Sequence, residues 1–223
     1  MKTTYKNLYQ LAAKNRGGVD NLEASLPRPK TAMQLAAQED DRYLSMMTRC
    51  VFRAGFVWRV IDNKWPGFEE AFSNFNPLAI AHYSDEKLEE LGKDTRIVRN
   101  FTKIVSVRHN ATYVLDKQHS HGSFGKFIAE WPETDIVGLW LELKKNGSRL
   151  GGNSGPGMLR SMGKDTFLLT QDVSDALVNQ GLMKKFSPTA QRDLRLVEQV
   201  FADLREQSGR SLCELSRILA FTV

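Results

Sequence analysis

One segment that could do chemistry is the glycine-rich run Gly151-Gly152-Asn153-Ser154-Gly155-Pro156-Gly157. It lies between two stretches with helical patterns, and Arg149, Arg160 and Lys164 are close to it in sequence. Backbone amides exposed at the start of a helix can bind a phosphate, so the pattern favours a hairpin that rests on a nucleic-acid backbone. An ordinary flexible loop explains the same residues equally well.

The same segment does not match a nucleotide-binding P-loop. The spacing from Gly157 to Gly163-Lys164 is one residue too long, and Asp165 stands where a Ser or Thr is required. We therefore expect neither a nucleotide nor any other cofactor.

Residue types that bind metals are few. Cys50 and Cys213 are too few for a disulfide framework or a Cys-rich zinc site, and we expect both to be reduced thiols. His119-Ser120-His121 is a close pair of histidines, but His82 and His109 are far from it, which is typical of a polar loop. The sequence predicts no bound metal.

The elements that must position these residues read as helices. Apolar residues recur at helical spacing within residues 33–58, 97–114 and 134–146, and again from Ala190 to Leu204 after an expected start at Ser187-Pro188. Ser211 and Glu214 form the pattern of a capping box for a last helix. Only residues 166–170 look extended, which is too short to support a sheet. The fold class is therefore predicted to be all-α, a helical bundle.

Composition limits the organisation and the partners. The prolines of Leu26-Pro27-Arg28-Pro29-Lys30 favour an N-terminal arm and connector over residues 1–30, followed by a helical domain over 31–223 with the hairpin near 150–163. No apolar stretch approaches the roughly 20 residues of a membrane span, and no secretory signal is recognisable. We expect a cytoplasmic protein without a membrane partner. The net charge of +5 is compatible with a polyanionic partner but does not require one.

Three stretches in a fixed order carry a resemblance to a known family. They are Ala54-Gly55-Phe56-Val57-Trp58, Phe72-x-x-Phe75-Asn76-Pro77, and Ile97-Val98-Arg99-Asn100-x-x-Lys103-Ile104. Together they resemble the DNA-3-methyladenine glycosylase I family, and Leu150-Gly151 through Met162-Gly163 is similar to its helix-hairpin-helix motif. The resemblance implies a helix-hairpin-helix DNA glycosylase-like bundle. It also implies a double-stranded DNA substrate with an alkylated base, such as 3-methyladenine, and a role in base excision repair.

The resemblance assigns roles around a base-binding pocket. Members of the family extrude the damaged base from the stack, and Trp58 matches the tryptophan that stacks on it, although a core tryptophan is the alternative. Phe52 and Phe56 are candidates for the same pocket, although either is commonly a core residue. The family's recognition glutamate falls on Cys50, whose thiol cannot reproduce a carboxylate.

The resemblance also assigns residues beyond the pocket. The wider superfamily has an aspartate soon after the hairpin, and Asp172 is the candidate here, although another alignment places Thr170 there. Asp172 has an alternative role as the N-cap of a helix that begins at Val173. The residues expected to hold the DNA backbone are Gly151, Gly152, Asn153, Ser154, Gly155, Arg160 and Lys164.

These observations lead to one leading hypothesis and two alternatives. The leading hypothesis is a monofunctional DNA N-glycosylase that removes alkylated bases. The first alternative is a non-catalytic helix-hairpin-helix module that binds DNA, which the replacement of the glutamate by Cys50 favours. The second is a helical interaction protein that has lost DNA affinity as well.

Overall fold

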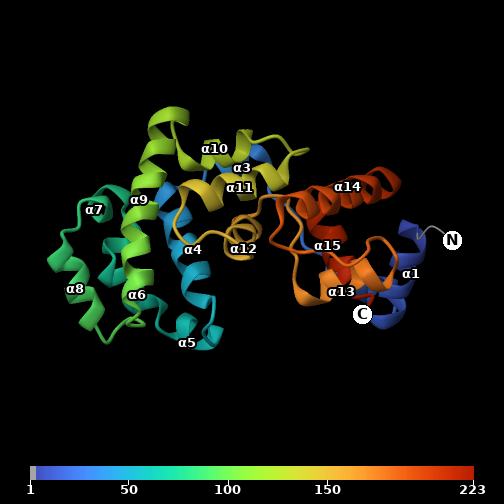
Figure 1. Ribbon diagram of the computed structural model, residues 1–223, viewed down its shortest axis with the longest axis horizontal. Coiled ribbons are helices and arrows are strands. Elements are labelled where there is room, and N and C mark those ends of the chain that lie inside the picture. The colour runs from blue at the N-terminus through green and yellow to red at the C-terminus, as the bar shows by residue number, and fades with distance from the viewer. Residues whose placement is uncertain (1–3) are drawn as a thin grey trace. The chain divides into compact units, whose positions relative to one another are not determined.

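The computed structural model describes residues 4–223, and these residues form helices joined by turns and irregular segments, with no strand among them (Figure 1). The prediction of an all-α fold is confirmed. Contacts between the helices divide the chain into two compact units. The central unit comprises Thr31–Trp131 and Leu139–Met162, and the terminal unit comprises Met1–Lys30, Pro132–Gly138 and Gly163–Val223.

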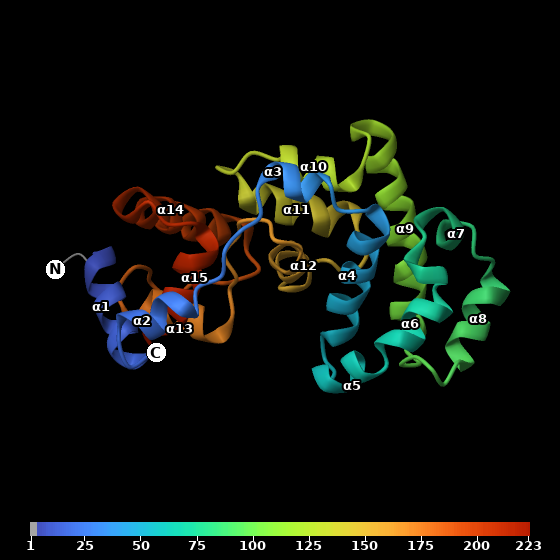
Figure 2. The same cartoon turned by 180° about the vertical axis from the view of Figure 1, so that it is seen from behind.

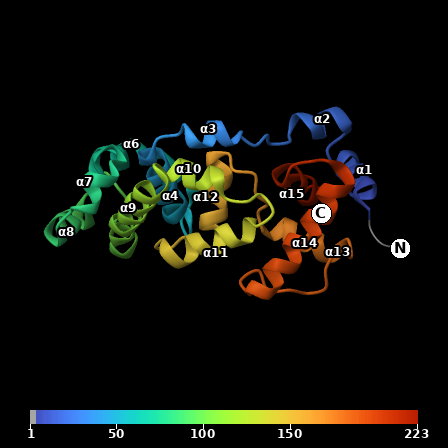
Figure 3. The ribbon, with the colours of Figure 1, turned by 90° about the horizontal axis from the view of Figure 1, so that it is seen from above.

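The central unit is built around two helices, α4 (Asp40–Arg53) and α9 (Phe101–His121), which pack on each other. Figure 3 shows α7 and α8 along α9, a placement that their contacts support. The remaining helices are α3 (Ala32–Ala36), α5 (Trp58–Asn63), α6 (Trp65–Ala71), η1 (Ser73–Phe75), α7 (Pro77–Ala81), α8 (Asp85–Lys93), α10 (Phe124–Glu130) and α12 (Ser154–Met162), with all but the first turn of α11 (Ile136–Asn146).

Local sequence explains the ends of α9. The Asn100 side chain accepts a hydrogen bond from the backbone N–H of Lys103 and so caps the first turn. The helix ends at Gly122, whose φ of 88° lies in the left-handed region that glycine adopts without strain. The expected helix over 97–114 is thus present but begins four residues later, at Phe101.

Stacked aromatic rings pack against α4 in the core of the central unit. Phe68 packs against Phe52 and Trp65, and the rings of Phe72 and Phe75 continue the stack. Ring pairs in these offset and edge-to-face arrangements contribute beyond the area they bury. This rigid core fixes α4, which carries Cys50 and leads into the Ala54–Trp58 segment.

The terminal unit contains α1 (Tyr5–Asn15), α2 (Val19–Ala24), α13 (Gln171–Asn179), α14 (Gln191–Ser208) and α15 (Leu212–Ala220). In Figure 2, α1 and α2 lie beside one another, and α15 contacts α1, α13 and α14. The capping box predicted at Ser211 and Glu214 is confirmed at the start of α15. The predicted helix start at Ser187-Pro188 is wrong. Residues 187–190 form a turn in which the Ser187 N–H donates to Asp193, and α14 begins at Gln191.

The two units divide the chain differently from the expected arm (1–30) and domain (31–223). The boundary near Lys30 coincides, but the N-terminal helices belong with the C-terminal ones. The reason is hydrophobic burial, because Ala12, Ala13 and Leu22 form one core cluster with Ile218. No helix within residues 4–223 is long and apolar enough to cross a membrane.

Candidate nucleic-acid interface and base pocket

The glycine segment forms a hairpin between two helices, as predicted. Helix α11 ends at Asn146 and α12 begins at Ser154. A Cβ atom added at Gly155 would lie 2.5 Å from the Leu150 carbonyl oxygen, which accepts a hydrogen bond from the Gly155 N–H. Glycine is therefore required at 155 by the close approach of the backbone. Gly152 has a φ of 58° and faces open space at the tip of the hairpin.

Helix α9 holds the start of this hairpin through a residue that sequence reasoning missed. The Asn110 side chain is buried, donates to the Ser148 carbonyl oxygen (3.1 Å) and accepts from the Ser148 N–H (2.7 Å). The neighbouring His109 ring nitrogen lies 3.2 Å from the Asn146 carbonyl oxygen. The signal in the sequence was an asparagine next to Ala111, on the apolar side of a long helix.

The expected phosphate-binding residues differ in exposure. Gly152 and Asn153 are exposed, Gly151, Ser154 and Arg160 are half-buried, and Gly155 is buried. Lys164 contradicts the prediction, because its side chain is only 4% exposed and burial lowers the pKa of its ammonium. Lys164 also belongs to the terminal unit, whereas the other residues of this set belong to the central unit. We do not retain it as a phosphate ligand.

The segment after α4 projects aromatic side chains into solvent. Residues 54–60 are all exposed, and the turn depends on Gly55, whose φ is 78°. Trp58 is 63% exposed and Phe56 is 38% exposed, so neither is the core residue of the alternative interpretation. Phe52 is 0% exposed and packs edge-on against Phe68 at 4.8 Å, so its assignment to the pocket surface is wrong. It belongs to the buried face of α4 with Leu44 and Thr48.

Lys103 on α9 fixes the end of α4 and the turn that follows. Its buried ammonium donates hydrogen bonds to the carbonyl oxygens of Phe52 and Ala54 and lies 4.5 Å from the centre of the Phe56 ring. A positive charge at the C-terminal end of a helix is favourable. Burial, and then the charge of Arg149, lower the pKa of Lys103. Sequence reasoning included Lys103 in a motif but gave it no role.

Replacing Lys103 should therefore destabilise the protein. In Lys103→Met the two carbonyl oxygens lose their donor, and we expect the free energy of unfolding to fall by about 1 to 3 kcal/mol. Urea denaturation of this variant and of Lys93→Met, which changes an exposed lysine at the end of α8, measures the difference. Equal stability of the two variants would show that the buried ammonium does not hold the turn.

Two arginines on α4 share one carboxylate on α5, the helix that begins at the exposed Trp58. Arg53 and Arg49 both form ion pairs with Asp62 on α5, at 2.6 and 2.9 Å. The Arg53 guanidinium lies 5.0 Å from the centre of the Trp58 ring, within the range of a cation–π interaction. Burial raises the pKa of Asp62, but the hydrogen bonds from Arg53 and Arg49 outweigh this and hold it below its usual value. Asp62 is therefore ionised at neutral pH and holds Arg53 beside Trp58. The Arg49 guanidinium, in contrast, lies 5.1 Å from the centre of the Trp65 ring.

Cys50 lies on α4 close to the hairpin helix. A Cβ atom at Gly157 of α12 would be 4.0 Å from the Cys50 sulfur. Burial raises the pKa of the thiol to about 11, and the nearby charges of Arg53 and Arg49 only partly oppose this. The residue at the family's glutamate position is therefore a neutral thiol at physiological pH.

Asp172 lies in the first turn of α13, and the alternative prediction that it is the N-cap of this helix is wrong. Thr170 caps this helix, because its side chain accepts a hydrogen bond from the Val173 N–H at 3.3 Å. Asp172 is exposed, and a negative charge is favourable at this end of a helix. The extended segment predicted at 166–170 is irregular and not a strand.

No cluster of three or more His, Cys, Asp or Glu side chains with metal-binding geometry occurs in the described part of the chain. His119 and His121 lie at the end of α9, and the His121 Nδ1 is 3.5 Å from a carboxylate oxygen of Glu130.

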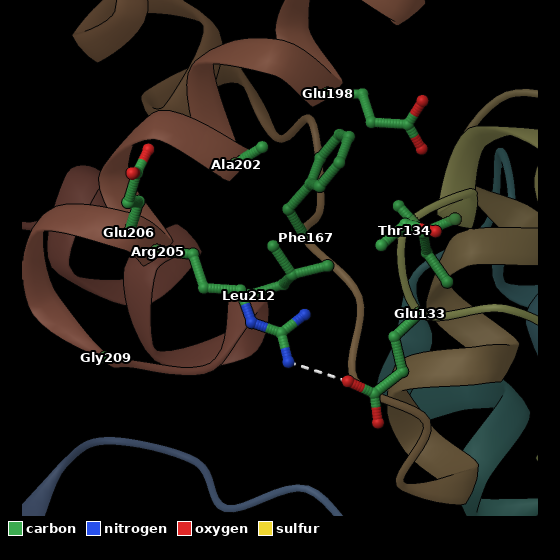
Figure 4. Close-up of a pocket in the computed structure, with 10 residues that line it drawn as sticks. Glu133, Thr134, Phe167, Glu198, Ala202, Arg205, Glu206, Gly209 and Leu212 are labelled. Carbon is green, nitrogen blue, oxygen red and sulfur yellow. Dashed lines mark hydrogen bonds and ion pairs between the residues drawn. The ribbon is translucent and has the colours of Figure 1, made fainter.

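The terminal unit contains a separate hollow of about 440 Å³ (Figure 4). Phe167, Ile136 and Leu212 give it an apolar lining, and an ion pair of 2.7 Å between Arg205 and Glu133 crosses one side. Glu198 on its rim accepts hydrogen bonds from the Val137 N–H and from Arg195. None of the residues predicted for the site lines this hollow.

Comparison with solved structures identifies the class of fold. A 3-methyladenine DNA glycosylase I from Staphylococcus aureus superposes with a TM-score of 0.53 at 20% identity, over 65% of this chain and 84% of that one. An 8-oxoguanine glycosylase/lyase from Methanocaldococcus jannaschii, solved with DNA that contains 8-oxoguanine, gives a TM-score of 0.57 at 14% identity, over 96% of each chain. The fold is that of the helical DNA glycosylases.

The sequence then identifies the family. The methyladenine glycosylase profile matches residues 34–146, which cover α4, the Ala54–Trp58 segment and α9 and end with α11. The chain belongs to the methyladenine glycosylase family. By family it is therefore a DNA glycosylase, a class of hydrolases that act in DNA repair.

Proposed function

We propose that this protein is a monofunctional N-glycosylase that extrudes an alkylated base from duplex DNA and replaces it with water at C1′. The observation that carries the proposal is the exposed Trp58 at the start of α5, where the family has its base-stacking tryptophan. A large aromatic side chain with this much exposure costs the protein hydrophobic burial, which a stacked base would restore.

The hairpin supports the proposal from the side of the DNA backbone. Its tip at Gly152 and Asn153 is exposed, while Asn110 and Gly155 hold the rest of the loop in place. The N–H groups of Ser154, Gly155 and Gly157 at the start of α12 already donate to carbonyl oxygens of the hairpin, so a phosphate would approach the backbone at the exposed tip instead. Such contacts fix the position of the duplex without reading its sequence.

Bulk at the hairpin tip should weaken binding to all duplexes alike. Gly152→Val adds a side chain where the backbone has a left-handed φ and a phosphate would approach, so we expect roughly a tenfold loss of affinity and a smaller salt dependence. Fluorescence anisotropy over a range of salt concentrations measures both quantities.

Gly181→Val is a matched control for this experiment, because Gly181 also has a positive φ (67°) and faces open space but lies in the terminal unit. Gly155 is unsuitable because any side chain there would collide with the Leu150 carbonyl. If Gly152→Val and the parent bind equally, the hairpin is not the DNA contact.

The direct test of the proposal is release of bases from a panel of duplexes that each contain one alkylated base. Release of at least one of them, in proportion to enzyme and at single turnover, is the expected result. Failure on the whole panel together with salt-dependent binding to duplex DNA would favour a non-catalytic helix-hairpin-helix module instead. The observation that favours this second candidate is the neutral thiol of Cys50 at the family's glutamate position.

A further inference from the structure

Basic side chains of the central unit lie against the two exposed aromatic rings. Arg53 lies 5.0 Å from the Trp58 ring centre, and Lys103 lies 4.5 Å from the Phe56 ring centre. Arg49 shares Asp62 with Arg53. Arg149, at the start of the hairpin, is close enough to Lys103 that its charge adds to the lowering of that lysine's pKa.

Of the carboxylates near these four cations, Glu69 accepts a hydrogen bond from Trp65 but is bound by another cation, Arg42, which leaves Asp62. No acidic residue occurs from Leu44 to Val60 in the sequence. Asp62 is a single carboxylate that binds two guanidinium groups, so this cluster keeps a net positive charge. The ammonium of Lys103 is bound by backbone carbonyl oxygens, which are neutral. Cys50, at the position of the family's glutamate, adds no charge because its thiol stays protonated.

We propose that the surface formed by Phe56 and Trp58 accepts a damaged base that is uncharged at neutral pH and selects against the cationic methylated purines. The proposal rests on the proposed function, since it requires the base to enter beside Phe56 and Trp58. A base with a fixed positive charge would approach Arg53 and Lys103, and the Asp62 carboxylate beside Arg53 is already shared between two arginines. At separations of several ångströms such repulsion weakens binding by about tenfold or more, depending on how much water screens it.

The same charges suit the departure of a neutral base. When its C1′–N bond breaks, both electrons of the bond leave with the base, so negative charge develops on the base and positive charge on the sugar. Water then forms the new bond to C1′, and the proton that it loses balances the charge of the departed base. Cations near the base stabilise the transition state more than the ground state, because the charge on the base appears only as the bond breaks.

The test compares two bases of the same shape and different charge. 7-Methylguanine is cationic in DNA, and 7-deaza-7-methylguanine is its neutral isostere. We expect the protein to bind the duplex with the neutral base at least about tenfold more tightly than the duplex with the cationic base. Each affinity is first divided by the affinity for the undamaged duplex. Equal affinities, or tighter binding of the cationic base, would overturn the proposal.

Substitution of Cys50, at the position of the family's glutamate, tests the effect of the missing carboxylate directly. Cys50→Glu restores a carboxylate and should shift the ratio of the two affinities toward the cationic base by about tenfold or more. Cys50→Gln has almost the same size without the charge and should keep the parent's ratio. If both variants lose folding, as judged by their helical signal, the comparison of the two bases by the parent protein still decides the proposal.

Base release separates this proposal from the proposed function. Faster release of ethenoadenine, an alkylated but uncharged base, than of 7-methylguanine would support both. Efficient release of 7-methylguanine with no preference for neutral bases would keep the glycosylase function and reject the charge selection. Tighter binding of the neutral isostere without release of any base would support the charge selection and reject the catalytic function.

Discussion

Asp172→Asn should abolish base release while it leaves the affinity for duplex DNA nearly unchanged. The carboxylate lies in the first turn of α13 and is exposed, and the capping of this helix is done by Thr170, so its removal does not cost the helix its N-cap. We expect it to act when positive charge develops on the sugar as the base departs. Asparagine has nearly the same shape without the charge, so the loss should appear in the chemical step.

The size of this effect and its control are both measurable. Loss of one group that stabilises charge in a transition state commonly reduces the rate about a hundredfold to a thousandfold. Asp175→Asn is a matched control on the same helix, since Asp175 is also exposed and accepts a hydrogen bond from Gln171. Single-turnover release should be lost in the first variant and kept in the second. An active parent whose Asp172→Asn variant keeps full activity would exclude this role.

The features that the sequence predicted well depend on short-range chemistry. The hairpin was recognisable because glycines at fixed spacing permit the left-handed φ of Gly152 and the close approach at Gly155. The capping box at Ser211 likewise needs only residues within one turn. Such features are determined by a few neighbouring residues, so a single sequence is enough to find them.

Two of the errors, at Asp172 and at Phe52, have local causes. Thr170 and Asp172 are both good N-caps, and the choice depends on which backbone N–H groups the rest of the fold leaves free. Phe52 is four residues after Thr48 on the buried side of α4, and this periodicity was a signal that it belongs to the core. Trp58 follows the end of α4, where helical periodicity no longer indicates burial.

The parts of the site that the sequence could not reveal depend on contacts between distant residues. Lys103 reaches carbonyl oxygens 49 and 51 residues earlier in the chain, and Asn110 binds a backbone group 38 residues later. The burial of Lys164 is a similar case, because a lysine beside a glycine hairpin is usually exposed and only the fold covers this one. No local pattern distinguishes Lys103 and Lys164 from ordinary surface lysines, and the only signal for Asn110 was its place on the apolar side of a long helix.

Trp58→Ala should impair both capture of the damaged base and its release, with little effect on folding. Its side chain is 63% exposed, so its removal takes away little buried area and the melting temperature should stay close to that of the parent. Stacking of a base on an aromatic ring contributes about 1 to 3 kcal/mol in related single-strand recognition. Its loss corresponds to a decrease of roughly 5-fold to 150-fold in affinity for the damaged duplex relative to an undamaged one.

Two further variants separate stacking from general apolar contact. Val57→Ala removes an apolar side chain that is 70% exposed and adjacent to Trp58, and it should cost much less than Trp58→Ala. Trp58→Phe keeps an aromatic face and should keep part of the preference for damaged DNA. Affinity for matched damaged and undamaged duplexes and single-turnover release are the measurements. If Trp58→Ala and Val57→Ala lose the same small amount, Trp58 is only part of an apolar surface, and the base must be held by other residues.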